Sequence, residues 1–216
     1  MQKFTTVSSV AAPLPESSID TDVIFPARFL LLPDKKGLGA QLFHERRQKT
    51  GDGPAFVLDR PPFDAAEILV AGAAFGTGSS REQAVWALAD FGIRCVIAES
   101  FGEIFFANCF KNGILPIVLT GPDHAAVLAE AEAARPIEVD LERCEIGMAD
   151  GAVIGFEVDA HRRRSLLNGL DEIGMILTDD AAEIAAFEER QRQLRPWLHL
   201  GPDKLAHFAD LGEEIS

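Results

Sequence analysis

Short apolar segments alternate with longer segments of helical pattern between residues 68 and 119. The apolar segments are Ile68–Ala71, Cys95–Ala98 and residues 114–119, and helices are expected over 79–91 and 101–110. Strands that alternate with helices of about 10–15 residues form βαβ units, in which successive strands run parallel. The sequence therefore predicts an α/β fold, with a mixed or parallel sheet flanked by helices.

The flanking segments extend this prediction along the chain. Short strands are expected over 137–158, and a charged amphipathic helix is expected over 178–193. Residues 34–53 are poor in β-branched side chains and run into the turn-forming sequence GDGP, which predicts a long mobile loop with one helical turn. We expect a single domain over 1–198, followed by a C-terminal tail over 199–216.

Two serines precede the expected helices with the spacing of a capping box. Ser79 stands three residues before Glu82, and Ser100 stands three residues before Glu103. In a capping box the serine hydroxyl accepts a hydrogen bond from a free backbone N–H of the first turn, while the glutamate reaches back. Both serines are therefore predicted to cap helices.

The charge balance disfavours one class of partner. The chain has 34 acidic and 20 basic side chains, for a net charge of −14. Proteins that bind a phosphate backbone usually carry the opposite sign, so nucleic acid is not expected as a partner. No apolar run reaches the roughly 18 residues of a membrane span, and the N-terminus has no apolar block typical of a secretory signal. The expected location is the cytoplasm, without membrane attachment.

The cysteines and histidines show no ligand spacing. Cys95, Cys109 and Cys144 are odd in number and widely separated, whereas disulfide scaffolds need pairs and zinc or cluster sites typically use Cys-x-x-Cys. The five histidines are equally scattered. The sequence therefore predicts that this chain itself holds neither a metal nor a cofactor, and it favours a reducing environment.

The segment from Gly76 to Glu82, GTGSSRE, stands where a strand ends and a helix begins. It lacks a glycine or lysine that the dinucleotide fingerprint, the P-loop and the nucleophile elbow each require. What remains is a helix N-terminus with two hydroxyls and a guanidinium, a combination suited to anions. Two interpretations stay open. Either Arg81 binds a carboxylate and Ser79 abstracts a proton, or Ser79 is only a cap and Arg81 an exposed first-turn residue.

A second polar cluster lies near the N-terminus. Asp20, Thr21 and Asp22 precede an apolar segment that reaches Arg28. One interpretation is a simple turn into a strand. The other is a site in which the paired carboxylates orient a hydroxyl or a cation and Arg28 joins an anion site.

Two further polar segments are ambiguous. Residues 108–113, NCFKNG, suit either the C-terminal cap of the preceding helix or part of a site. The expected loop is locally basic, which suits either a solvated loop or a flap that meets an anionic substrate or an acidic partner. Its cations are Lys35, Lys36, Arg46, Arg47 and Lys49.

The order and spacing of three motifs resemble a known family. Asp20-Thr21-Asp22, GTGSSRE at 76–82 and NCFKNGILPI at 108–117 are similar to the small subunits of 3-isopropylmalate dehydratase, in the aconitase superfamily. The resemblance runs from about residue 17 to residue 198. It implies a compact swivelling β/β/α domain of the aconitase C-terminal type, made as a separate chain.

The resemblance also implies a reaction and a partner. The family interconverts 2-isopropylmalate and 3-isopropylmalate by dehydration and rehydration, a step of leucine biosynthesis. A [4Fe–4S] cluster held by a large partner subunit binds the hydroxyl of this small dicarboxylate substrate. Carried onto this sequence, Ser79 is the base, Arg81 binds a substrate carboxylate and Ser80 supports them by hydrogen bonding. The chain is then active only together with the large subunit.

Substrate choice is expected to involve the loop after the first strand. Leu31 and its leucine neighbours in residues 28–34 suit an isopropyl group, and Arg28, Thr21 and Asp22 complete the candidate substrate-binding set. A hydrophobic pocket separates neighbouring alkyl groups by only about 1–3 kcal/mol per methylene. Other branched 2-hydroxy diacids, of the dimethylmalate or methylmalate type, therefore remain alternatives. A non-catalytic module that binds a carboxylate is an alternative of a different class.

Overall fold

The computed structural model describes residues 1–31, 35–48, 54–79, 81–199 and 201. Contacts between Cα atoms divide the chain into two compact units, Met1–Glu172 and Ile173–Ser216. The domain boundaries predicted from the sequence, a single domain over 1–198 and a tail over 199–216, are not tested by this division and remain predictions. No helix in the described ranges is both long and apolar enough to cross a membrane.

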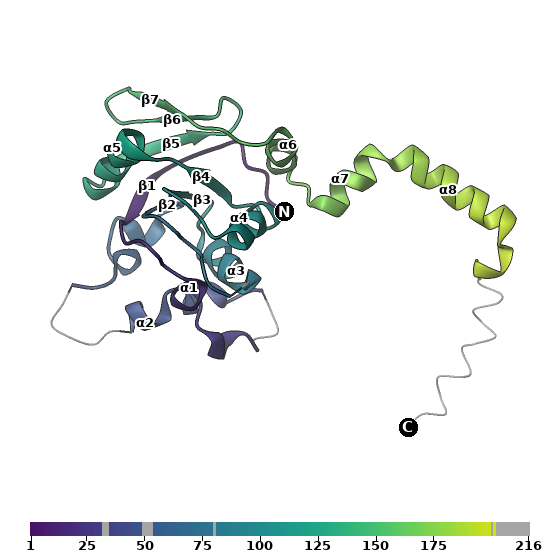
Figure 1. Cartoon of the computed structure of the whole chain (residues 1–216), viewed down its shortest axis with the longest axis horizontal. Helices are drawn as coiled ribbons and strands as arrows, with labels where there is room; N and C mark the ends of the chain where they lie inside the picture. The colour runs from purple at the N-terminus through teal and green to yellow at the C-terminus, as the bar shows by residue number, and fades with distance from the viewer. Residues whose placement is uncertain (32–34, 49–53, 80, 200, 202–216) are drawn as a thin grey trace. The chain divides into compact units, whose positions relative to one another are not determined.

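A mixed sheet forms the centre of the first unit (Figure 1). Seven strands are described, in the spatial order β4-β3-β2-β1-β5-β6-β7. The pairs from β4 to β1 are parallel, and the pairs from β1 to β7 are antiparallel. The strands are β1 (Thr6–Leu14), β2 (Ile68–Ala71), β3 (Cys95–Ala98), β4 (Leu115–Val118), β5 (Pro136–Asp140), β6 (Glu145–Gly147) and β7 (Val153–Gly155).

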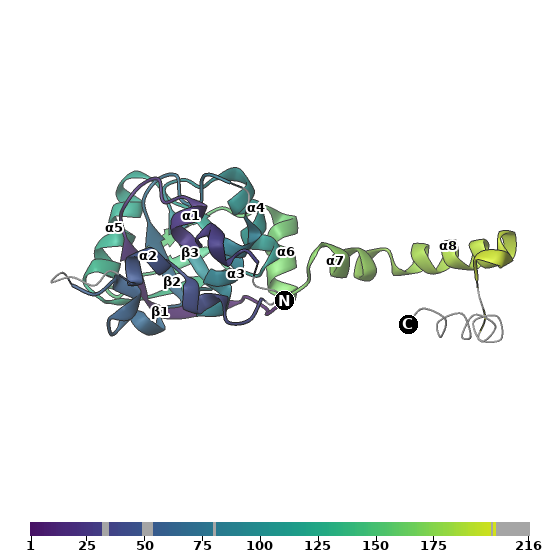
Figure 2. The ribbon, with the colours of Figure 1, turned by 90° about the horizontal axis from the view of Figure 1, so that it is seen from below.

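Helices cover both faces of the parallel strands, as the alternation predicts. The α-helices described in the first unit are α1 (Thr21–Ile24), α2 (His44–Arg47), α3 (Glu82–Phe91), α4 (Glu103–Lys111), α5 (Gly121–Glu132) and α6 (Ala160–Asn168). The second unit contains α8 (Ala181–Leu194) and most of α7 (Glu172–Asp179). Figures 1 and 2 show α3 and α5 apart, with β2 and β3 between them.

Two hydrophobic clusters form the core, one on each face of these strands. Alternate residues of a strand point to opposite faces. Accordingly Leu69 packs in the cluster that contains Leu88 of α3, whereas Ile68 packs in the cluster that contains Val127 of α5. All four residues of β2 and of β3 are buried, because helices cover both faces.

The sequence pattern does not predict β1. Its sequence, TVSSVAAPL, has small residues and a proline in place of the β-branched run that marks β2. Residues 6–10 pair with β5 and residues 11–14 pair with β2. Pro13 therefore lies beyond the part of β1 that pairs with β5. A proline has no N–H, and on that side of β1 no described strand is paired with it that would need one.

Both predicted serine caps are wrong. α3 begins at Glu82 with Arg81 at the N-cap, and α4 begins at Glu103 with Gly102 at the N-cap. Neither N-cap residue caps its helix through its side chain. The hydroxyl of Ser100 instead accepts a hydrogen bond from the backbone N–H of Ala74, at 2.8 Å. Contacts between loops have displaced the local capping pattern.

The described part of the predicted loop over 34–53 contains two short helical segments. Residues 35–48 contain a 3₁₀ turn at Leu38–Gln41 and the single turn α2, while 34 and 49–53 lie outside the described residues. Arg46 pairs with Glu16 at 2.6 Å, and Arg47 pairs with Asp59 at 2.8 Å. Two of the basic side chains are thus paired with acids of the chain itself.

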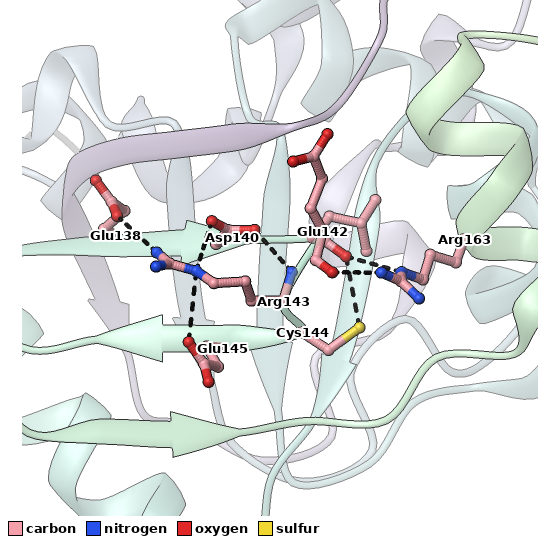
Figure 3. A network of polar contacts seen from close by, with 8 residues as sticks. Glu138, Asp140, Glu142, Arg143, Cys144, Glu145 and Arg163 are labelled. Carbon is pink, nitrogen blue, oxygen red and sulfur yellow. Dashed lines mark hydrogen bonds and ion pairs between the residues drawn. The ribbon is translucent and has the colours of Figure 1, made fainter.

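Two arginines hold the turn between β5 and β6 (Figure 3). Arg163 of α6 donates hydrogen bonds to the backbone carbonyls of Leu141, at 3.0 Å, and Glu142. Arg143 lies within ion-pair distance of the carboxylates of Asp140, Glu145 and Glu138. Arg163 thereby connects the antiparallel strands to α6. The guanidinium groups of Arg143 and Arg163 both have structural partners within the chain.

A buried carboxylate gives the first unit a dependence on pH. Glu130 of α5 is 6% exposed and accepts two hydrogen bonds from Arg135, at 2.6 and 2.7 Å. These hydrogen bonds hold the pKa of Glu130 below its ordinary value, against an opposing effect of burial. The charge of Arg135 and the backbone N–H of Ala149 act in the same direction as the hydrogen bonds. A lowered pKa in the folded state stabilises the fold above the unfolded-state pKa of about 4.3, and the benefit is lost as the pH falls through the folded-state value.

We expect Glu130→Gln to lower the free energy of unfolding at pH 7 and to flatten its decline below about pH 4.3. Urea denaturation at pH 7, 5, 4 and 3 measures both effects. Glu188→Gln is the matched control, because Glu188 is 56% exposed and pairs with Arg192 only at 3.9 Å on α8. Parallel pH profiles for wild type and Glu130→Gln would contradict the expectation.

Candidate functional site

The loop after β2 is held on one side by the segment that leads into α1. The backbone N–H of Gly76 donates to the carbonyl of Ile19 at 2.7 Å, and that of Thr21 donates to the carbonyl of Thr77 at 2.9 Å. Asp20 caps α1, because its carboxylate accepts from the N–H of Val23 at 2.8 Å. The predicted turn into a strand at residues 20–22 is therefore wrong: Asp20 starts a helix.

The loop after β3 holds the other side. The N–H of Phe75 donates to the carbonyl of Ser100 at 3.0 Å, and the N–H of Gly102 donates to the carbonyl of Phe75 at 2.9 Å. A Cβ atom on Gly76 would lie 2.2 Å from the ring of Phe105, and Gly76 has φ +72°. Only glycine fits this crossing of loops without displacing an aromatic ring.

Ser79 lies at the end of this supported loop, three residues before α3. Its side chain is exposed, and its backbone carbonyl accepts a hydrogen bond from the hydroxyl of Thr21 at 2.8 Å. Thr21 is itself only 2% exposed, so this anchor is shielded from solvent. Ser79 lines a cavity of about 220 Å³. The other residues of its wall are Gly76, Thr77, Gly78, Arg81, Gly102, Glu103, Ile104, Phe105 and Asn108.

Arg81 lies in the same wall and forms an ion pair with Asp22. The Arg81 side chain is 16% exposed, whereas that of Asp22 is 53% exposed. A partly buried guanidinium held by one carboxylate keeps N–H donors free for a second anion. Arg81 also precedes the first turn of α3, whose backbone N–H groups lack helical partners. This wall therefore offers guanidinium and backbone N–H donors to an anion.

Arg28 and Asp22 line a neighbouring cavity of about 530 Å³. The guanidinium of Arg28 pairs with Glu45 and stacks on the ring of Phe29 at 4.8 Å. Leu31 is 92% exposed and is not part of the wall of either cavity.

Among the predicted site residues, the structure thus brings Ser79, Arg81, Thr21 and Asp22 together. Arg28 adjoins them across the larger cavity, Leu31 stands apart in solvent, and Ser80 lies outside the described residues. Ile104 and Asn108 also line the smaller cavity. The sequence does not single out Ile104, whereas Asn108 belongs to the segment 108–113, which suited either a helix cap or part of a site.

The two buried cysteines of this chain do not suit a metal or an iron–sulfur cluster. Cys95 and Cys109 are fully buried in the two core clusters, and burial raises the pKa of both thiols. Thiolates are the form that binds iron, so burial disfavours ligation. Over the described ranges, no group of three or more His, Cys, Asp or Glu side chains could hold a metal ion.

Comparison with known proteins gives a consistent result. The aconitase C-terminal domain family matches residues 1–122, and a family described as the C-terminal domain of the 3-isopropylmalate dehydratase small subunit matches residues 179–200. The 3-isopropylmalate dehydratase small subunits of Jannaschia sp. and Paramagnetospirillum magneticum are 52% and 53% identical, over 92% of this chain and all of each relative.

A solved structure agrees with the fold. The crystal structure titled as 3-isopropylmalate dehydratase from Methanocaldococcus jannaschii superimposes with a TM-score of 0.62 at 25% identity. The match covers 84% of this chain and 99% of that one. The predicted α/β fold of the aconitase C-terminal type is confirmed, as is the resemblance of the three motifs. Identity of about half over nearly the whole length shows that this chain belongs to the family of 3-isopropylmalate dehydratase small subunits.

Proposed function

We propose that this chain is the small subunit of a cytoplasmic hydro-lyase that interconverts 2-isopropylmalate and 3-isopropylmalate in leucine biosynthesis. The observation that carries the proposal is that an exposed Ser79 and a partly buried Arg81 line the same cavity. A dehydration next to a carboxylate needs a base and a fixed positive charge. Both are available there, and relatives of about 50% identity carry the name of this enzyme.

In this proposal Ser79 removes the proton and Arg81 binds a carboxylate of the substrate. Negative charge on the Ser79 oxygen and on the intermediate is stabilised by Arg81 and by the start of α3. Thr21 and Asp22 serve as positioning residues, because Thr21 anchors the carbonyl of Ser79 and Asp22 orients Arg81. Arg28 and Ser80 are assigned supporting contacts to the substrate.

The proposed partner is the large subunit, which would carry a [4Fe–4S] cluster. The relatives are named small subunits, and this chain's two buried cysteines do not suit a cluster. When bound, such a cluster supplies a Lewis acid for the substrate hydroxyl. Because Ser79 is exposed in the chain alone, the partner must also cover the cavity and exclude water before an alkoxide can persist.

Reconstitution tests the function. The chain and its large subunit, mixed anaerobically with iron, are expected to convert 2-isopropylmalate and to produce the absorbance of the alkene. Neither chain should do so alone. A panel of branched malates on the same complex separates the isopropylmalate enzyme from a dehydratase for a related diacid. Tight dicarboxylate binding by the isolated chain, together with an inactive complex, would favour a carboxylate-binding module instead.

Leu31 is proposed to contact the alkyl group of the substrate once the partner covers it. Its exposure of 92% is consistent with a side chain that becomes buried on assembly. We expect Leu31→Ala to raise the KM for 2-isopropylmalate about 10-fold, with little change in kcat. The loss of one methylene contact in a hydrophobic pocket costs about 1–3 kcal/mol, and a tenfold change lies within that range. Val153→Ala is the control, because Val153 is also exposed and lies on β7. An unchanged KM would remove Leu31 from the substrate pocket.

A further inference from the structure

Two asparagines near the end of α4 indicate a further residue of the proposed site. Asn108 lies in the last turns of the helix, and Asn112, four residues on, is its C-cap residue. The amide of Asn112 donates to the carboxylate of Glu82 at 2.9 Å and to the carbonyl of Asn108 at 2.9 Å. Glu82 is the first residue of α3 and directly follows Arg81. This end of α4 is therefore turned towards the start of α3.

One turn earlier, Asn108 lines the same cavity as Ser79 and Arg81. Its side chain is partly buried. Within the described part of the chain, its amide has no hydrogen-bond partner. In the same wall, the hydroxyl of Thr77 donates to the carbonyl of Ala74 at 3.2 Å, and Asp22 engages part of the guanidinium of Arg81. A partly buried amide without a partner, in the same wall as Arg81, is suited to a polar ligand.

We propose that Asn108 is a further substrate-binding residue, whose amide N–H donates a hydrogen bond to a carboxylate oxygen of the bound dicarboxylate beside Arg81. The inference rests on the proposed function, because it adds a contact to the same site. An amide is neutral and offers two N–H donors, so it holds an anion without adding a charge that must be compensated. A carboxylate at this position would instead repel the substrate.

The test uses the reconstituted complex with two substitutions. Asn108→Ala is expected to raise the KM for 2-isopropylmalate about 10- to 100-fold, the range for losing one hydrogen bond to a charged group, while kcat changes little. Asn108→Asp is expected to raise KM further at pH 8. This excess should persist from pH 6 to pH 9, because an aspartate carboxyl, with an ordinary pKa of about 3.9, stays ionised throughout that range and repels the substrate.

Asn168→Ala is the matched control. Asn168 also lies on a helix, and its amide donates to the carbonyl of Arg164 at 2.8 Å, away from the cavity. A merely structural role for Asn108 would change the thermal midpoint of the variants and leave KM and its pH profile as in the wild type. That result overturns the assignment.

Failure of this inference and failure of the proposed function are distinguishable. If the wild-type complex is active and both Asn108 variants keep its KM, only the assignment of Asn108 falls. If the wild-type complex does not turn over any branched malate, calorimetry with 2-isopropylmalate decides. If Asn108→Ala binds 2-isopropylmalate more weakly than the wild type and Asn168→Ala does not, the contact is supported. If Asn108→Ala binds as tightly as the wild type, or if the wild type does not bind, the contact is overturned.

Discussion

Replacing Ser79 with alanine is expected to lower kcat of the reconstituted complex by about 10²–10⁴-fold, the usual contribution of a positioned general base. The hydroxyl is the group proposed to remove the substrate proton. The loop itself should not change, because Thr21 anchors the backbone carbonyl of residue 79 and not its side chain. The substitution thus separates chemistry from folding.

The measurement is kcat at saturating substrate, with assembly followed by size-exclusion chromatography. Exchange of the substrate proton with solvent deuterium reports the proton transfer directly and should be lost with kcat. Ser8→Ala is the control, since Ser8 is an exposed residue of β1. A Ser79→Ala complex that turns over at the wild-type rate would show that Ser79 only terminates a loop.

Replacing Arg81 with alanine is expected to lower kcat/KM by about 10²–10³-fold, equivalent to about 2.7–4.1 kcal/mol at 1.36 kcal/mol per tenfold. The guanidinium is proposed to bind a substrate carboxylate through two N–H donors, the geometry that makes charge-assisted pairs strong. Removing it would also leave Asp22, which pairs with Arg81, as an uncompensated negative charge beside an anionic substrate. Arg81→Lys should recover only part of the loss, because an ammonium group lacks the planar fork.

Asp22→Asn isolates the positioning role from the binding role. It keeps the charge of Arg81 but weakens the contact that orients it, so a smaller loss in kcat/KM, about tenfold, is expected. Arg143→Ala is the control, because Arg143 also pairs with carboxylates but lies at the turn between β5 and β6. Equal kinetics for wild type and Arg81→Ala would exclude Arg81 from the substrate site.

The central strands could be predicted because their sequences permit few alternatives. β2, β3 and β4 are runs of four largely apolar residues, too short for buried helices and separated by helical segments. β1 could not be recognised in this way, since its pairing with two neighbours of opposite direction compensates for its small residues and Pro13. The helix α5 is not predicted either, and its sequence is rich in alanine with few large apolar residues.

The chemistry of the site is a property of the sequence, and its geometry is a property of the fold. The motif GTGSSRE, with its hydroxyls and its arginine, suits an anion site without any coordinates, but the sequence alone left open that Ser79 is only a cap and Arg81 only an exposed residue. That α3 begins at Glu82 and leaves Ser79 in a supported loop was decided by hydrogen bonds that the loop donates to Ile19 and Ser100 and accepts from Thr21. These partners lie some 20 to 60 residues away along the chain, and local capping preferences of about 1 kcal/mol yield to several such contacts together.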